Sequence, residues 1–224
     1  MDLFIILIPV IGLIFFLIFY YSKKQSIIRK LKRLPSSKIT SLKTNEYVKL
    51  TGKALQLEAP LIAPFSKRSC IFYTIVIEEE KGDDDSSSWS TVIKDEKIQP
   101  FLIEQNGDYL LISPENSPKN YTSYLVVDSK TSSGTFNNPS PKFKALLNKY
   151  AIKSTNFLGF NRQLRYKEGI VEIGEEITVA GVVRWKTLKE PIKGYSYSKI
   201  ATLESTQEKE LIITDLPKAK VNKS

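Results

Sequence analysis

Residues able to perform acid–base, nucleophilic or metal chemistry are scarce in this chain. Among its 224 residues there is one cysteine, Cys70, and no histidine. Without histidine, no side chain has an ordinary pKa near neutrality, and serine or cysteine nucleophiles lack their usual imidazole base. One cysteine and no histidine cannot build a Cys/His zinc site, and no disulfide can form within the chain. We therefore expect a non-enzymatic protein without a cofactor or a bound metal.

Acidic residues gather in one polar stretch and at the end of one apolar stretch. Asp83, Asp84 and Asp85 precede three serines and offer oxygen ligands, but they lack the EF-hand spacing and its distal glutamate. The preferred interpretation is a solvated loop, and the functional alternative is a surface that binds a protein partner. Three glutamates at residues 78–80 end an apolar run, and we interpret them as a strand that runs into solvent.

Cys70 lies beside Ile71 and Phe72 in an apolar run. A buried cysteine behaves as a small hydrophobe, whereas a reactive thiol needs an electropositive and partly open setting. Lys67 and Arg68 are close in sequence and keep the reactive alternative open. The preferred prediction is a buried, unreactive thiol.

Prolines and aromatic residues are the last group of candidates. Pro60, Pro64 and Phe65 are candidate rim residues of a groove that binds a partner peptide. The larger aromatic residues are expected in the core rather than on a ligand platform, namely Trp89, Trp185 and Phe101.

The first element of the chain is an apolar stretch. Residues 3–21 read LFIILIPVIGLIFFLIFYY and contain no charged residue. As a helix this stretch is about 28 Å long, close to the hydrocarbon thickness of a bilayer. Its proline and glycine are tolerated in membrane helices. Because no positive residue precedes it and no small-residue cleavage site follows it, we expect an uncleaved transmembrane anchor.

Positive charge is concentrated beside this stretch. Of the net charge of +9, residues 1–43 carry +7 and residues 217–224 carry +3, which leaves −1 for residues 44–216. A nucleic-acid-binding domain should carry positive charge on the fold itself, so we expect no nucleic acid partner. The basic residues expected at the membrane surface are Lys23, Lys24, Arg29, Lys30, Lys32 and Arg33.

This basic flank also predicts the orientation of the chain. By the positive-inside rule it places the remainder of a single-pass protein in the cytoplasm, at a bacterial inner membrane or an organelle membrane. Residues 26–34 are amphipathic and predict a helix that either continues the anchor or lies on the bilayer surface. Plain topology is the preferred role of these charges over binding of a specific lipid.

From residue 46 onward the pattern predicts short strands, rich in β-branched and aromatic residues and separated by turn residues. The strongest, residues 69–80, is expected at the centre of a sheet. Asn106 and Gly107 predict a tight hairpin between residues 101–103 and 109–112. Further strands are predicted at residues 47–57, 61–64, 89–94, 99–104, 124–127, 164–172, 176–186, 196–204 and 210–214.

Loops are expected at residues 81–88 and 129–139. Ser140 followed by Pro141 is a helix start signal and predicts one short helix over residues 141–150. Together these elements predict a mainly β fold: a compact barrel- or sandwich-like domain with one short helix, preceded by a single N-terminal transmembrane helix. The predicted segments are an anchor at 1–22, a basic juxtamembrane helix and linker at 23–45, the β domain at 46–216 and a basic tail at 217–224.

Several segments of the β domain, in their order along the chain, carry a family resemblance. They are VKLTGKA, APLIAPFSKRSCIFYTIVIEE, a tryptophan before PFLIEQNGDYLLI, RYKEGIVEIGEEITVAGVV and LIITD. Residues 47–215 thereby resemble the GIDE, or beside-a-membrane, domain of membrane-anchored ubiquitin ligases of mitochondria and plastids and of bacterial relatives. The resemblance implies a compact β-rich domain held next to a membrane.

The resemblance does not extend to ligase activity. In the eukaryotic ligases a second membrane helix and a C-terminal RING follow the domain, and the RING carries the activity. This sequence has no second apolar span and no RING cysteines or histidines. In the mitochondrial relatives the domain lies between the two membranes, whereas the basic flank here predicts the cytoplasm.

We therefore expect a membrane-anchored, non-catalytic β domain that acts as a protein-interaction or regulatory module at the bilayer surface. Its expected partners are the lipid bilayer and a protein that the sequence does not identify. One alternative is a component of a ubiquitin-ligase-type system whose RING another chain supplies. A second alternative is a sensor of anionic lipid surfaces that uses the basic residues of segment 23–43 and the tail.

Overall fold

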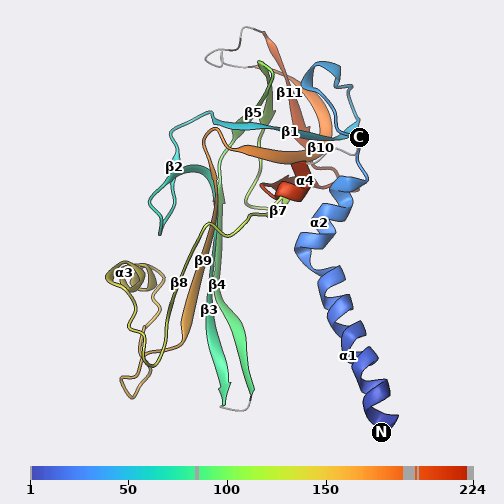
Figure 1. Ribbon diagram of the computed structural model, residues 1–224. Helices are drawn as coiled ribbons and strands as arrows, with labels where there is room; N and C mark the ends of the chain where they lie inside the picture. Colours follow the sequence, from blue (N-terminus) through green and yellow to red (C-terminus); the bar gives the residue numbers. More distant parts are fainter. Residues whose placement is uncertain (1, 84–85, 189–194, 196, 221–224) are drawn as a thin grey trace.

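A closed barrel of five strands forms the upper part of the computed structural model (Figure 1), which describes residues 2–83, 86–188, 195 and 197–220. In pairing order, the barrel strands are β1 (Tyr47–Gln56), β5 (Phe101–Gln105), β6 (Asp108–Ile112), β11 (Lys199–Glu204) and β10 (Glu176–Thr187). Because β10 also pairs with β1, the ring closes. The predicted mainly β, barrel-like class is therefore confirmed.

The strand order is that of a Greek-key barrel of the OB type. Numbered along the chain, the five strands follow the order 1-2-3-5-4, and the third and fifth, β6 and β11, form a parallel pair. Fully buried apolar side chains fill the barrel, among them Leu50, Ile103 and Val179. Since side chains fill a small barrel, its ligands must bind on the outside.

The β5–β6 hairpin shows how local sequence sets the register of the barrel. Asn106 and Gly107 occupy the turn with φ of 55° and 88°. Such positive φ values match the twist of the flanking strands, and asparagine and glycine adopt them at low cost. The predicted hairpin is confirmed, with Phe101 opposite Ile112.

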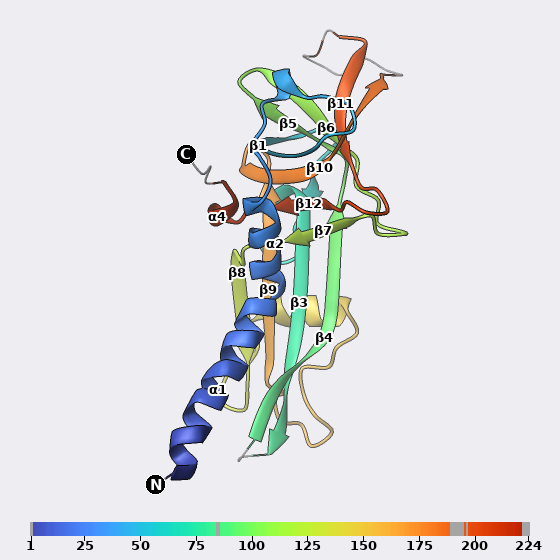
Figure 2. The same ribbon diagram turned by 90° about the vertical axis from the view of Figure 1, so that its right-hand side faces the viewer.

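A second sheet extends away from the barrel (Figures 1 and 2). Its strands are β4 (Ser86–Ile98), β3 (Ser69–Asp83), β9 (Leu164–Glu172) and β8 (Ser129–Ser133), with the short β2 (Leu61–Ile62) beside the start of β3. The predicted central position of the strongest strand is confirmed, because β3 pairs with β4 on one edge and with β9 on the other. Two more strands, β12 (Leu211–Thr214) and β7 (Tyr121–Tyr124), extend the barrel sheet from β10.

The two faces of the second sheet are covered differently. Along residues 73–77, buried side chains on one face alternate with half-exposed side chains on the other. Helix α3 (Pro141–Lys149) begins after the predicted Ser140 cap and lays Phe143 and Leu147 on the buried face. Figures 1 and 2 show α3 on one side of this sheet and the N-terminal helices on the other. The half-exposed face is therefore the one turned toward the N-terminal helices.

Two helices precede the barrel, α1 (Asp2–Tyr21) and α2 (Lys23–Lys32). The described side chains of α1, at residues 8 and 10–21, are all exposed. Among the residues that the structure describes, no single helix has the length and apolarity of a membrane span. Val10–Tyr21 meets that criterion only together with Lys23–Lys32, across a bend of 61°. The transmembrane assignment of residues 3–21 stays a prediction.

Helix α2 is part of the folded domain rather than of a separate linker. Its apolar side chains Ile27, Ile28 and Leu31 are at most 3% exposed and pack against Ile212 of β12 and Ala219 of α4 (Pro217–Lys220). The predicted boundaries at 45/46 and 216/217 therefore cut through one apolar cluster. The prediction that residues 26–34 continue the anchor or lie on the bilayer is corrected, because amphipathicity does not reveal which apolar surface the helix meets.

Other differences concern polar segments. The loop predicted at residues 81–88 is wrong, because β3 and β4 continue as a two-stranded extension to Asp83 and from Ser86. The loop predicted at residues 129–139 begins with strand β8, and the strand predicted at 124–127 lies earlier, as β7. The last two strands, predicted at 196–204 and 210–214, are β11 and β12, and both pair with β10. A short 3₁₀ turn at Ile39–Ser41 leads into the barrel.

Candidate functional site

Cys70 is buried and has no exposed surface. Burial raises the pKa of its thiol to about 11, and the charges of Glu168 and Glu172 add to this shift. A covered, protonated thiol is a poor nucleophile, so the prediction of a buried cysteine is confirmed. Within the described residues there is no cluster of three or more His, Cys, Asp or Glu side chains able to hold a metal ion.

The rim residues proposed for a peptide groove are partly or fully buried. Pro64 is buried, Phe65 packs half-buried against the core under α3, and Pro60 is half-buried. The loop is fixed by Glu168, a fully buried carboxylate that accepts the Phe65 backbone N–H at 2.9 Å. Burial removes Pro64 from the rim of such a groove, and partner binding at Pro60 and Phe65 stays a prediction.

The acidic partner-binding residues lie at the far end of the β3–β4 extension. Asp83 is the last residue of β3 and pairs with Ser86. Asp84 and Asp85 lie outside the described residues. Partner binding by this acidic turn stays a prediction.

The six basic residues expected at a membrane surface have different surroundings. Arg29 places its guanidinium 3.9 Å from the ring centre of Tyr20, and Lys30 forms an ion pair with Glu210 at 2.7 Å. Within the described part of the chain, the other four form no ion pair: Lys23, Lys24, Lys32 and Arg33. Of these four, Arg33 lines a pocket together with Glu208 and Glu210, whereas Lys23 lines a pocket on the second sheet.

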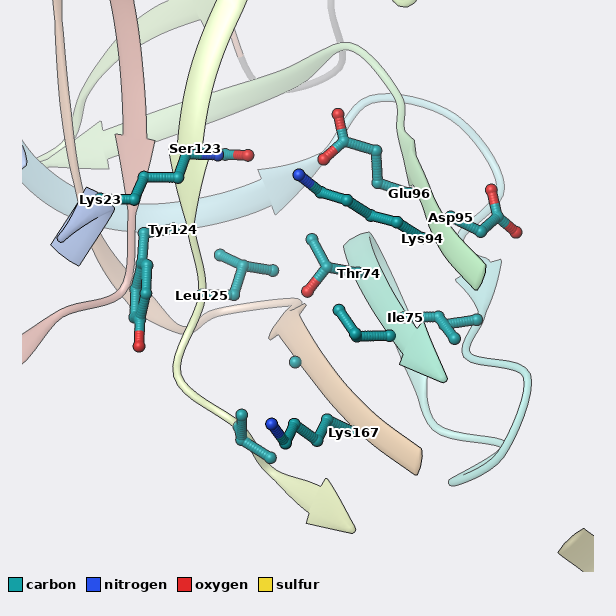
Figure 3. A pocket seen from close by; sticks show the side chains of 13 residues that line it. Lys23, Thr74, Ile75, Lys94, Asp95, Glu96, Ser123, Tyr124, Leu125 and Lys167 are labelled. Carbon is teal, nitrogen blue, oxygen red and sulfur yellow. The ribbon is translucent and has the colours of Figure 1, made fainter. Parts of the chain in front are cut away.

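This lysine pocket has a volume of about 220 Å³ and lies between the start of α2, the end of β7 and the half-exposed face of the second sheet (Figure 3). The floor of the pocket consists of residues that are cross-strand neighbours on β4, β3 and β9. They form two rows, Lys94–Val76–Lys167 and Glu96–Thr74–Gly169. Figure 3 shows Lys23 and Lys94 extending toward one another from opposite sides, whereas the Asp95 carboxylate points away. The pocket therefore gathers three lysines from far-apart parts of the chain.

One wall of the lysine pocket depends on the absence of a side chain at Gly169. The segment after β7 crosses directly above it, so that a Cβ at this position would lie 2.6 Å from the Val126 carbonyl oxygen and 2.9 Å from the Leu125 Cβ. Any side chain would therefore displace the crossing segment. The sequence marks this position only as a glycine within a strand.

A second open pocket, of about 390 Å³, lies on the barrel beside β6, the end of β10 and the start of β11. We call it the aromatic pocket, because it is lined by Tyr109, Trp185, Tyr195 and Tyr197. The ring centroid of Tyr195 lies 6.1 Å from that of Tyr109 and 5.4 Å from that of Tyr197, both in edge-to-face contact. Trp185 is 47% and Tyr197 is 71% exposed. The pocket therefore presents aromatic surface to solvent, beside the Asp108 carboxylate.

The aromatic pocket occupies the position at which OB barrels usually hold ligands. That position comprises the face of the second and third strands and the loop between the fourth and fifth. Here Tyr109 belongs to the third strand, and Tyr195 and Tyr197 precede the fifth. The Tyr195 hydroxyl donates to the Lys199 carbonyl at 2.7 Å, which fixes this ring. Burial, together with Tyr197 and Asp108, raises the pKa of Tyr195, which keeps its hydroxyl protonated at neutral pH.

The sequence analysis assigned the two tryptophans to the core. Phe101 is buried as predicted, but Trp89 is 37% and Trp185 is 47% exposed, so that assignment is wrong for both. Along β10 the residues from Ile177 to Val183 are buried, and those from Arg184 onward are exposed. Apolar character alone does not distinguish a buried tryptophan from one that lines an open pocket.

No family model matches the chain, and neither the curated proteins nor the solved structures contain a significant match. The resemblance to the GIDE family stays an expectation from the sequence.

Proposed function

We propose that this chain is a membrane-anchored, non-catalytic binding module whose barrel holds an extended segment of a protein partner beside the bilayer. Helix α1 is the proposed anchor, and the aromatic pocket is the proposed partner site. The observation that carries the partner site is the exposure of Trp185 and Tyr197 around one hollow. Tryptophan and tyrosine dominate binding energies at protein interfaces because they bury large, rigid surfaces.

The exposed apolar surface of α1 supports anchoring. Phe15, Phe16 and Ile18 are each more than half exposed. In water such surface is unfavourable by about 25 cal/mol per Å², whereas a hydrocarbon environment accepts it. Tyr20 and Tyr21 at the end of α1 are suited to the bilayer interface, and the basic residues that follow favour the cytoplasmic side.

The charge of the barrel region favours a protein over a nucleic acid as partner. Residues 44–216 carry a net charge of −1, and the aromatic pocket contains the Asp108 carboxylate. Because Lys199 is the one cation on the described lining and Asp108 offsets it, a phosphate backbone would meet no net positive charge there. Extended peptide segments, in contrast, dock readily in open aromatic-lined hollows. Ubiquitin transfer is not part of this proposal.

Photo-crosslinking of the full chain in membranes tests the partner site. A photoreactive phenylalanine analogue replaces Trp185 or, as the matched control, the fully exposed Phe136 in the turn that follows β8. We expect a discrete, protease-sensitive adduct from position 185 and none from position 136. Tyr109→Ala should lower the yield of the adduct about tenfold, as expected for loss of an aromatic hot-spot residue.

The outcomes separate the two halves of the proposal. Equal crosslinking from positions 185 and 136 would reject the aromatic pocket as a partner site. An adduct that nuclease removes would replace the protein partner with a nucleic acid. Release of the chain from membranes by alkaline carbonate would reject the anchor, whatever the crosslinking shows.

A further inference from the structure

The lysines around the lysine pocket are only partly neutralised. Two ion pairs lie beside it, Lys167–Glu78 and Lys119–Glu96. Lys23 and Lys94 form no ion pair with any described carboxylate. The pocket therefore holds two ammonium groups that extend toward one another and form no ion pair, with the Glu96 carboxylate beside Lys94 (Figure 3).

The pKa of Lys23 reflects the positive charges that surround it. Lys23 is an exposed residue, but partial desolvation lowers its pKa, and the charges of Lys119 and Lys94 lower it further. Glu96 and Glu210 act in the opposite direction, but with smaller effects. An anion between the ammonium groups would relieve the repulsion and favour the charged form of Lys23.

The nearby carboxylates are engaged elsewhere. Asp95 accepts the Tyr150 hydroxyl at 2.8 Å on the α3 side of the sheet. Glu96 accepts the Tyr121 hydroxyl at 3.0 Å in addition to its ion pair with Lys119. Asp95 therefore points away from the pocket, whereas Glu96 uses Oε1 for both contacts and stays on the pocket lining beside Lys94.

We propose that the lysine pocket binds the phosphate group of an anionic ligand between Lys23 and Lys94. Lysine binds phosphate as a compact point charge, and the hydroxyls of Thr74 and Ser123 on the lining add possible donors. A volume of about 220 Å³ is smaller than the sites that hold drug-sized ligands, and it suits a single phosphate with its ester carbon atoms.

A phospholipid headgroup is the expected source of this phosphate. Only Ser22 separates Lys23 from Tyr21, the last residue of α1. The pocket lies on the half-exposed face of the second sheet, and this face is turned toward the N-terminal helices (Figure 2). If α1 crosses the bilayer, the pocket lies beside the headgroup region. Only this choice of source rests on the proposed anchoring; phosphate binding itself depends neither on the anchor nor on the aromatic pocket.

Lipid retention tests the inference. The full chain is placed in nanodiscs of phosphatidylcholine with a minority of phosphatidylglycerol, and the lipids that stay bound after release are counted by native mass spectrometry. We expect one retained anionic lipid. Lys23→Gln and Lys94→Gln should each lower its retention about tenfold, as expected for loss of one charged hydrogen bond. The matched controls Lys24→Gln and Lys32→Gln remove the same charge outside the pocket and should retain the lipid.

A second measurement uses inorganic phosphate as the probe. The thermal midpoint of the full chain in uncharged detergent is compared in phosphate and in chloride at equal ionic strength. We expect phosphate to raise the midpoint of the wild type and of Lys24→Gln, but not that of Lys94→Gln. Circular dichroism in chloride verifies that Lys94→Gln is folded, and Lys94→Arg should restore both effects.

Each outcome decides a different point. A phosphate shift without lipid retention supports the pocket and assigns it to a soluble phosphate ester. Equal losses of lipid retention in the pocket variants and in the controls would overturn the proposal, because diffuse surface charge would then explain the binding. The absence of both lipid retention and a phosphate shift would overturn it as well. Failure of the chain to enter nanodiscs would reject the anchor. The thermal midpoint in phosphate would then be the test of phosphate binding by the pocket.

Discussion

Glu168 joins the loop after β2 to the middle of β9: its Oε2 atom accepts the backbone N–H of Phe65 at 2.9 Å, across 103 positions of the chain. Oε1 accepts the Ser66 N–H at 3.0 Å, and the Tyr166 hydroxyl donates to Oε2 at 2.8 Å. The Glu168 side chain is completely buried. Three neutral donors, rather than a described lysine or arginine, therefore compensate its charge.

Replacing this carboxylate should destabilise the fold. Glu168→Gln turns an amide NH₂ group toward backbone donors, and we expect the free energy of unfolding to fall by about 2 kcal/mol. Urea denaturation followed by circular dichroism measures the change. Glu172→Gln on the same strand is the control, because that side chain is 44% exposed and pairs with Arg68 at 3.4 Å; we expect a loss below about 0.5 kcal/mol. Equal losses would show that Glu168 does not hold the loop.

Cys70 should resist alkylation in the folded chain. It is fully buried, and its pKa is raised to about 11, so almost no accessible thiolate exists at pH 8. Maleimide labelling followed by mass spectrometry should show modification only after urea is added. Ser88→Cys, at an exposed position of β4, supplies the control thiol that labels without urea. Rapid labelling of native Cys70 would contradict its assignment to the core.

Gly169→Ala should displace the segment that crosses above β9. The added methyl group would lie 2.6 Å from the Val126 carbonyl oxygen, and we expect a loss of about 2 kcal/mol in unfolding free energy. At Gly134 the nearest atom to an added Cβ is 3.4 Å away, so Gly134→Ala should change stability by less than about 1 kcal/mol. Similar effects at both positions would indicate that the crossing segment adjusts freely.

Asp215 should make stability depend on pH. The side chain is 5% exposed, and both of its oxygens accept the Val126 N–H, at 2.9 and 3.0 Å. Burial raises the pKa of Asp215 to about 7, and the charge of Glu175 adds to the shift. In the unfolded chain an aspartate has a pKa of about 4. Between these values the folded state binds the proton more tightly, so this contribution to stability is lost as pH rises from about 4 to 7.

Asp215→Asn removes this titration while keeping an oxygen that can accept the Val126 N–H. The stability of the variant relative to the wild type should therefore rise between about pH 4 and pH 7 and stay constant at higher pH. Urea unfolding at a series of pH values measures the difference. A constant difference across the window would show that Asp215 does not change its protonation state there.

Features encoded by adjacent residues were predictable from the sequence. Asn106 and Gly107 specify the β5–β6 hairpin through their tolerance of positive φ, and Ser140 with Pro141 specifies the start of α3. The length of β3 and its run of β-branched and aromatic residues likewise predict a central strand. These signals depend on conformational preferences and burial patterns that act within a few positions.

Features that depend on distant pairing were not predictable. The lysine pocket exists because the register places Lys94 and Lys167 on either side of Val76, and no local pattern states that register. Trp185 lies beyond the buried part of β10, where sequence alone shows only an aromatic residue in a strand. The polar β3–β4 extension was interpreted as a loop because its residues lack the apolar alternation that usually identifies strands.

The packing of α2 against the end of the chain has a consequence for the order in which the protein assembles during synthesis. Lys30 contacts Glu210, 180 positions later, and the apolar face of α2 rests on Ile212 and Ala219. When α2 leaves the ribosome, the surface that will cover it has not yet been translated. Docking of α2 must therefore be among the last folding events. A chain whose translation stops before Ile212 lacks part of the apolar surface on which α2 packs, so its two N-terminal helices would not dock on the barrel.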